Sequence, residues 1–395
     1  MAHFDSLCVQ ETTDLRTTKP HILPLYLTSS FAFDSIDQGI RIFGKQEAGH
    51  VYGRYGNPTS DTVAAKLSTL ESYGTGIDSH AIMFSSGMAA IHTLALSLLK
   101  SGDQVLTQGN LYGGTTELFT KVMSRCGIET VMIDLTNPDE AERILAQTSH
   151  VKLIFFETPA NPTLSCIDLE AMCKLGNARG IPVAVDNTFA TPFLQQPLAY
   201  GADFVMHSTT KYLNGHGNSI AGVLIGRDTE FMQTRVWETM KLIGTHVSPM
   251  EAWLVYQGLK TLPLRMERHC ANALQLAGFL AQHPRVKLVN YTGLPSHAYH
   301  ALASKQMRAH GGMLSFELTG GLEAGIQAMR KIRFCTLAPT LGDIDTLILH
   351  PASMSHLNVP KEIRDRNGIT DGLIRVSVGI ENVADIIEDI DQAIR

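Results

Sequence analysis

Short runs of apolar residues recur between about residue 80 and residue 226, and segments of helical or loop character separate them. Strands that are buried on both faces read as continuous apolar runs, so this alternation predicts a parallel sheet covered by helices on both sides. In such sheets, ligands bind beyond the carboxyl ends of the strands. The predicted strands are Ala81–Phe84, Gln104–Gln108, Thr130–Leu135, Lys152–Glu157, Val183–Asn187, Phe204–Ser208 and Ala221–Gly226.

The pattern changes on both sides of this region. A helical pattern runs from Ser248-Pro249 to Leu259, and Pro263 starts a second one, as Pro does at a first helical position. Strand-like and helix-like segments then mix, which predicts a smaller α+β domain over residues 257–395 after a central domain over 61–256. Residues 1–60 lack this periodicity and predict an extended arm that reaches a neighbouring subunit. The later segments are strand-like Val286–Asn290, Gly311–Thr319 and Leu373–Val378, and helix-like Leu322–Ile332 and Glu381–Ile394.

Composition narrows the class of protein. The 395 residues are 44% hydrophobic and 18% charged, which predicts a folded globular chain. A net charge of −6 gives no basic field for nucleic acid or an anionic membrane surface. The apolar stretch Ala89–Leu99 is too short for a membrane helix, and Met1–Pro20 is acidic where a signal peptide is basic, so we expect a cytoplasmic protein. No Cys or His spacing predicts a metal site.

Asp186 ends one of the apolar strands, after Val183-Ala184-Val185. A carboxylate beside so much hydrocarbon needs a positive partner, because burial without one costs several kcal/mol. One reading is a turn or helix-cap residue in Asp186-Asn187-Thr188. The other is the partner of a cationic heteroaromatic nitrogen, such as the pyridinium of pyridoxal phosphate.

Lys211 and a Ser-Ser-Gly turn support the second reading. Lys211 follows the next strand within Ser208-Thr209-Thr210-Lys211, and a desolvated lysine amine forms Schiff bases with carbonyl cofactors. A lone lysine is more often a solvated surface charge. Ser85-Ser86-Gly87-Met88 follows another strand and opens a helix, where backbone N–H groups attract a phosphate. Alone, this turn is equally typical of an ordinary capped loop.

With these residues in place, the chain resembles the pyridoxal-phosphate enzymes of cysteine and methionine metabolism over essentially its whole length. The resemblance implies an aspartate-aminotransferase-like α/β fold (fold type I), with a mostly parallel seven-stranded central sheet, an extended N-terminal arm and a smaller α+β C-terminal domain. The stretches that carry it are Tyr52-Gly53-Arg54, Gly56-Asn57-Pro58-Thr59, Ser85-Ser86-Gly87-Met88, Leu111-Tyr112-Gly113-Gly114-Thr115, Glu157-Thr158-Pro159-Ala160-Asn161-Pro162, Val185-Asp186-Asn187-Thr188, the Lys211 segment and Leu373-Ile374-Arg375-Val376-Ser377-Val378-Gly379.

The resemblance also implies roles for single residues. Lys211 carries the cofactor and moves protons, Asp186 keeps the ring nitrogen protonated, and Tyr112 stacks on the ring and acts as an acid near the leaving group. The substrate is held by Arg375, which grips its carboxylate as a bidentate fork, together with Thr340 and Asn161. The residues implied to bind the cofactor are Tyr52 and Arg54 from a neighbouring subunit, and Ser86, Gly87, Met88, Tyr112, Asn161, Asp186, Ser208, Thr210 and Lys211.

Within the family, the C-terminal segments look most like the methionine γ-lyases. Cystathionine enzymes carry a Glu where this chain has Pro339, and that Glu recognises the distal amino group of cystathionine. The resemblance therefore implies α,γ-elimination of L-methionine to methanethiol, 2-oxobutyrate and ammonia, by a homotetramer with shared active sites that takes a small sulfur amino acid.

Other activities stay open. Gly114 stands where methionine γ-lyases have Cys, and Met240-Lys241 stands where they have a Lys-Asp pair. The alternatives are a cystathionine γ-lyase or γ-synthase, and an O-acylhomoserine sulfhydrylase. A cofactor-binding protein without turnover is a further alternative, against which the presence of both Tyr112 and Arg375 argues.

Overall fold

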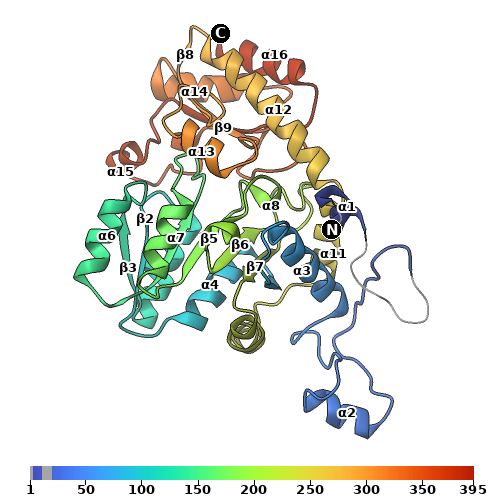
Figure 1. The fold of residues 1–395 in the computed structure, drawn as a ribbon. Helices are drawn as coiled ribbons and strands as arrows, with labels where there is room; N and C mark the ends of the chain where they lie inside the picture. The colour runs from blue at the N-terminus through green and yellow to red at the C-terminus, as the bar shows by residue number, and fades with distance from the viewer. Residues whose placement is uncertain (1–2, 11–19) are drawn as a thin grey trace.

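The computed structural model describes residues 3–10 and 20–395. Glu11 and Asp14, part of the acidic N-terminal segment noted above, lie outside these ranges. Figure 1 shows two sheets with their covering helices, one above the other, and an N-terminal arm that leaves the body. No helix in the described ranges is both long and apolar enough to cross a membrane.

The first sheet confirms the mostly parallel, seven-stranded prediction. Its strand order is β1-β7-β6-β5-β4-β2-β3, and only β7 runs antiparallel to its neighbours. All seven predicted apolar runs form strands; β2 and β6 have the predicted ends, and the ends of the other five differ by one or two residues. The strands are β1 His80–Phe84, β2 Gln104–Gln108, β3 Glu129–Ile133, β4 Val151–Glu157, β5 Val183–Asp186, β6 Phe204–Ser208 and β7 Gly222–Gly226.

Helices bury both faces of this sheet. Along β5, Val183 and Val185 join one hydrophobic core with α3 and α7, whereas Ala184 joins a second core with α4 on the opposite face. Successive strand side chains alternate between faces, so a continuous apolar run feeds both cores. The helices of this region are α3 Pro58–Glu71, α4 Gly87–Leu98, α5 Gly113–Glu117, α6 Pro138–Gln147, α7 Leu169–Asn177, α8 Thr191–Leu194, α9 Thr229–Phe231 and α10 Trp237–Ile243.

The C-terminal part contains a five-stranded sheet of order β10-β11-β12-β9-β8. The strand-like and helix-like segments beyond residue 280 lie on β8, β9, β12, α14 and α16, while β10 and β11 are too short to show a sequence pattern. Except for α11, which packs beside α3, these elements lie above the first sheet (Figure 1). They are α11 Pro249–Leu259, α12 Leu262–Ala281, β8 Val286–Asn290, α13 His300–Gln306, β9 Met313–Leu318, α14 Gly321–Lys331, β10 Thr336–Leu337, β11 Leu347–Leu349, α15 Lys361–Arg366, β12 Leu373–Ser377 and α16 Val383–Ile394.

Two helices interrupt the arm. They are α1, Phe4–Val9, and α2, Ile36–Phe43. Helix α2 begins with the N-cap Ser35, whose hydroxyl accepts from the Gln38 backbone N–H, while the Gln38 side chain accepts from the backbone N–H of Asp34, one residue before the cap. Helix α2 projects away from the rest of the chain (Figure 1).

Candidate active site

The N-terminus of α4 lies against the ends of β6 and β7. Ser86 caps the helix, and its hydroxyl accepts from the N–H of Ala89 at 3.0 Å. A Cβ on Gly87 would lie 3.0 Å from the Cβ of Ser208, and a Cβ on Gly222 would collide with the backbone of Ser86. Glycine at both positions therefore lets the helix terminus approach the two strands, as the turn before a predicted phosphate cradle requires.

Hydroxyl groups and a thioether surround this terminus. Ser208 ends β6 beside it, and the Thr210 hydroxyl, two residues later, hydrogen bonds to the backbone of Ala221. Met88 is the second residue of α4, and its sulfur lies 3.9 Å from the hydroxyl of Thr115 on α5. Ser86, Gly87, Met88, Ser208 and Thr210 are thus brought together at one corner of the sheet.

Asp186 ends β5 on the same face. Its Oδ1 accepts from the backbone N–H of Thr188 at 3.0 Å and from the Thr188 hydroxyl, which in turn accepts from the N–H of Ser208 at 2.9 Å. Burial raises the pKa of Asp186, and Thr188 and His207 oppose that rise. No ion pair joins Asp186 to a Lys, Arg or His of the described ranges, so the turn reading alone leaves its charge uncompensated.

Lys211, Thr340 and Arg375 form one hydrogen-bonded group. The Lys211 Nζ donates to the Thr340 hydroxyl at 2.9 Å, and the Arg375 guanidinium donates to the Thr340 carbonyl at 2.7 Å. Burial lowers the pKa of Lys211, and the Arg375 charge adds to this effect. Burial also lowers the pKa of Arg375 to about 10, and its Nε is buried without a partner in the described residues. An arginine with a free buried donor is suited to a carboxylate ligand.

Tyr112 follows β2 and leads into α5. Its side chain is 56% exposed, and its backbone N–H donates to Glu157 Oε2 at 3.0 Å. The ring lies over Gly114, where a Cβ would come within 2.6 Å of the ring Cε1. Any larger residue at position 114 therefore requires the Tyr112 ring to move.

Glu157 is a site residue to which the sequence analysis assigned no role. It ends β4, is 7% exposed, and accepts from the backbone N–H groups of Tyr112 and, at 3.4 Å, Asn161. Burial beside Asp186 raises its pKa to about 8. The sequence feature that marked Asp186, an acidic residue at the end of an apolar strand, also marks Glu157. It holds the backbones of two predicted site residues, and the Oδ1 of Asn161 is buried without a partner in the described chain.

Asp343 is a second residue without an assigned role. It is 6% exposed, and its carboxylate raises the pKa of Lys211 against the effects of burial and Arg375. It lies in the turn after Thr340, where a Cβ on Gly342 would lie 2.7 Å from the backbone N of Tyr212. Leu341-Gly342-Asp343 is among the C-terminal segments that carry the resemblance, but Gly342-Asp343 is typical of a surface turn, so its residue types assigned Asp343 no role.

Tyr52 and Arg54 are not part of this group. The Arg54 guanidinium lies 5.5 Å from the ring centre of Tyr52 and 5.1 Å from that of Tyr55, and donates to the carbonyl of Lys241. No described contact joins either residue to Ser86 or Ser208.

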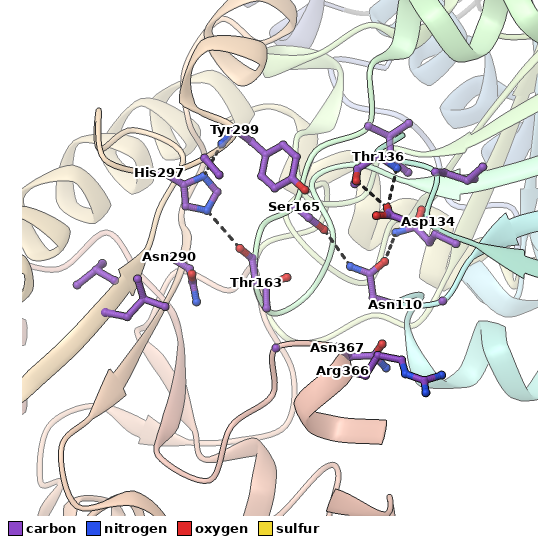
Figure 2. A pocket seen from close by; sticks show the side chains of 18 of the residues that line it. Asn110, Asp134, Thr136, Thr163, Ser165, Asn290, His297, Tyr299, Arg366 and Asn367 are labelled. Carbon is purple, nitrogen blue, oxygen red and sulfur yellow. Dashed lines mark hydrogen bonds between the residues drawn. The ribbon is translucent and has the colours of Figure 1, made fainter. Parts of the chain in front are cut away.

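A cavity of about 1080 Å³ lies beside the site, between the ends of β2 and β3 and the C-terminal domain (Figure 2). Most of its polar side chains are already paired. Asn110 donates to Ser165 at 2.9 Å, Asp134 accepts from Thr136, and His297 hydrogen bonds to Thr163. Lys211, Asp186 and Arg375 do not line it, so this cavity is separate from the candidate site.

The residues present fit pyridoxal phosphate. The α4 terminus and two hydroxyl residues suit its phosphate, Asp186 offers an unpaired carboxylate to its ring nitrogen, and Lys211 offers a desolvated amine to its aldehyde. These groups follow the carboxyl ends of β1, β5 and β6 at one edge of the sheet, where ligands of such folds bind.

Comparison with known proteins agrees with this arrangement. Residues 5–395 match the family model described as Cys/Met metabolism PLP-dependent enzyme. The chain belongs to this family. It is 46% identical over 373 residues to an L-methionine γ-lyase of Fusobacterium nucleatum subsp. polymorphum, covering 94% of this chain and 93% of that protein. It is 41% identical over 379 residues to a cystathionine β-lyase of Lactococcus lactis subsp. cremoris, covering 96% and 95%.

A solved structure carries the cofactor itself. A putative O-acetylhomoserine (thiol)-lyase from Campylobacter jejuni superposes with a TM-score of 0.93 at 34% identity, covering 100% of both chains, and holds a pyridoxyl-lysine phosphate. This member of the family is therefore a pyridoxal-phosphate enzyme of cysteine and methionine metabolism with the type I fold.

Proposed function

We propose that this enzyme eliminates methanethiol from L-methionine, and that hydrolysis by one water molecule then gives 2-oxobutyrate and ammonia. When bound, pyridoxal phosphate supplies an electron sink for the carbanion at the substrate α-carbon. Lys211 is positioned to attach the cofactor and then to take the α-proton and a β-proton. Its lowered pKa suits this role, because a general base works best when its pKa is near the working pH.

Four further residues bind the substrate or the cofactor, orient Lys211 or supply a proton. Arg375 binds the substrate carboxylate through its buried guanidinium, while Thr340 fixes the Lys211 amine beside it. Tyr112, exposed at the mouth of the site, delivers a proton to the departing sulfur. Asn161, whose backbone is held by Glu157, turns its amide to the cofactor.

The proposal that methionine is the substrate depends on one observation: an uncharged residue, Pro339, stands directly before Thr340. A substrate with a distal amino group needs an acidic partner, whereas a thiomethyl group needs none. Pro339 supplies no charge next to the Lys211–Thr340 hydrogen bond. The 46% identity to a protein named as an L-methionine γ-lyase supports the same choice.

Gly114 favours a second candidate, γ-replacement on an O-acylhomoserine by sulfide. The Tyr112 ring rests over Gly114, and O-acylhomoserine sulfhydrylases resemble this chain in having Gly at that position. An acyl group leaves as a stable carboxylate, so this reaction depends less on Tyr112 as an acid than the release of a thiol does. The putative O-acetylhomoserine (thiol)-lyase with the same fold supports this alternative.

A matched pair of variants tests the choice of substrate. Pro339→Glu places a carboxylate beside Thr340, and Pro339→Ala removes the proline without adding charge. We expect Pro339→Glu alone to raise the ratio of kcat/KM for cystathionine over methionine, by about tenfold for one new ion pair. Wild-type protein is offered methionine, homocysteine, cystathionine, and O-acetylhomoserine with sulfide. Efficient homocysteine synthesis without methanethiol release from methionine would establish the second candidate.

We also propose that the enzyme works as a homotetramer in which Tyr52 and Arg54 complete the site of a neighbouring subunit. Helix α2 exposes Ile36 by 79%, Ile40 by 62% and Phe43 by 65%. Such a contiguous apolar face marks an interaction surface. The arm that carries it ends immediately before α3, so the same segment could dock and present Arg54.

A further inference from the structure

A fully buried acid–histidine pair lies behind the candidate site. His207 on β6 and Glu71, the last residue of α3, are both 0% exposed, and the imidazole Nε2 lies 2.8 Å from Glu71 Oε2. The other ring nitrogen, Nδ1, is buried without a partner in the described residues. No role proposed above uses this pair.

The pair lies directly across the sheet from Asp186. Side chains alternate along β6, so His207 faces α3, while Met206 and Ser208 face α4. Asp186 is registered with Met206 and is tied to the Ser208 backbone through the Thr188 hydroxyl. His207 is therefore one residue along β6 from both contacts of Asp186.

Glu71 lies in a costly position for an ionised carboxylate. A helix C-terminus carries partial negative charge, and a buried carboxylate there needs a cation, for which the His207 imidazole is within hydrogen-bond distance. Burial raises the pKa of Glu71, and His207 and Asn187 oppose that rise. Asn187 directly follows Asp186, so the carboxylate faces a neighbour of Asp186 on β5 as well as His207 on β6.

We propose that Glu71 and His207 are a positioning pair: Glu71 holds His207 as a cation behind β6, and this cation keeps Asp186 ionised for the ring nitrogen of the cofactor. A pair serving only stability has no need of charge, because apolar residues of similar volume commonly replace buried ion pairs without loss of stability. The inference rests on the proposed cofactor site at Asp186.

The test compares two cofactor forms. Apoprotein is titrated with pyridoxal phosphate and with its 1-deaza analogue, whose ring carries carbon in place of nitrogen, and binding is followed by absorbance. We expect His207→Asn and Glu71→Gln each to lower the affinity of the apoprotein for pyridoxal phosphate about tenfold. This is the change in affinity that corresponds to one pKa unit at Asp186. Affinity for the analogue, which has no nitrogen to pair with Asp186, is expected to stay the same.

The controls separate this role from simple stability. His283→Asn breaks a His–Asp pair of 3.2 Å with Asp391 in the C-terminal domain, and it should lower the melting temperature without changing either affinity. The double variant Glu71→Met, His207→Leu keeps the packing without charge. It should fold with near wild-type stability, yet show the tenfold weakening for pyridoxal phosphate alone.

Asp186→Asn distinguishes failure of the positioning role from failure of the proposed cofactor site. If it weakens pyridoxal phosphate while His207→Asn, Glu71→Gln and the apolar double variant bind like wild type, the positioning role is wrong and the site stands. If Asp186→Asn also binds both forms like wild type, the proposed site is wrong, and the role of the pair falls with it.

Discussion

The carboxyl edge of the first sheet and the N-terminal arm differ in the partners that their candidate site residues find within one chain. At the edge, Asp186, Lys211 and Arg375 are held by Thr188 and Thr340, in surroundings that shift their pKa values. In the arm, Arg54 contacts the rings of Tyr52 and Tyr55 and the Lys241 carbonyl, none of which belongs to the group at the edge, and α2 turns its apolar side outward. One chain therefore brings most of the candidate site together, whereas Tyr52 and Arg54 make no contact with it among the described residues.

The largest effect expected is at the edge. Lys211→Ala should lower kcat at least about 1000-fold, because it removes both the attachment point and the base. Lys305→Ala is the matched control, since Lys305 forms an exposed ion pair with Glu170. Turnover of methionine is measured by 2-oxobutyrate formation. Near wild-type turnover by Lys211→Ala would remove this residue from the chemistry.

The arm gives the next largest effect. Arg54→Ala should be nearly inactive alone, yet recover activity when mixed with Lys211→Ala and allowed to exchange subunits. If sites are shared between two copies, random exchange leaves about a quarter of sites intact. Mass by light scattering is measured in parallel. A fully active monomer, or a mixture that stays inactive after proven exchange, would contradict the shared site.

Tyr112→Phe tests whether Tyr112 at the candidate site acts in the chemical step or in substrate binding. Removing the hydroxyl should lower kcat for methionine about 100-fold with little change in KM, because protonation of the leaving group belongs to the transition state. Tyr200→Phe removes an exposed hydroxyl that bonds to the Lys305 carbonyl and should change neither constant. A rise in KM at constant kcat would assign Tyr112 to binding alone.

The smallest effect concerns stability. The folded protein keeps the Glu157 proton until about pH 8, whereas the unfolded chain releases it near 4.5. The unfolded state therefore binds fewer protons in this window, and this residue makes the apoprotein less stable as pH rises from about 5 to 8. Glu157→Gln should remove that part of the slope, worth a few kcal/mol at most. Chemical denaturation of both proteins at several pH values measures it, and identical slopes would rule it out.

Sequence reasoning was strongest where burial leaves a pattern. All seven strands of the first sheet were predicted, because each is buried on both faces and reads as an apolar run. Asp186 was found because an acid at the end of such a run is chemically expensive. The same rule applies to Glu157, but its hydrogen bonds to two backbone N–H groups depend on loops that only the fold brings together.

Other features left weaker signals. Helix α2 has a serine N-cap, yet its apolar face turns outward, so no core pattern marked it. Asp343 lies in a turn sequence and gains its proximity to Lys211 from the packing of the C-terminal domain on the sheet. The pairing of Glu71 with His207 spans 136 residues, a separation that no local pattern encodes.

The central claim is that the strand-edge group holds pyridoxal phosphate through Lys211. The most direct measurement is borohydride reduction of the holoenzyme, followed by proteolysis and mass spectrometry of the phosphopyridoxyl peptide. We predict a single labelled peptide, with the label on Lys211 directly after the Ser208-Thr209-Thr210 segment. A label on another lysine, such as Lys241 beside Arg54, or no label on a holoenzyme that turns over methionine, would contradict the account.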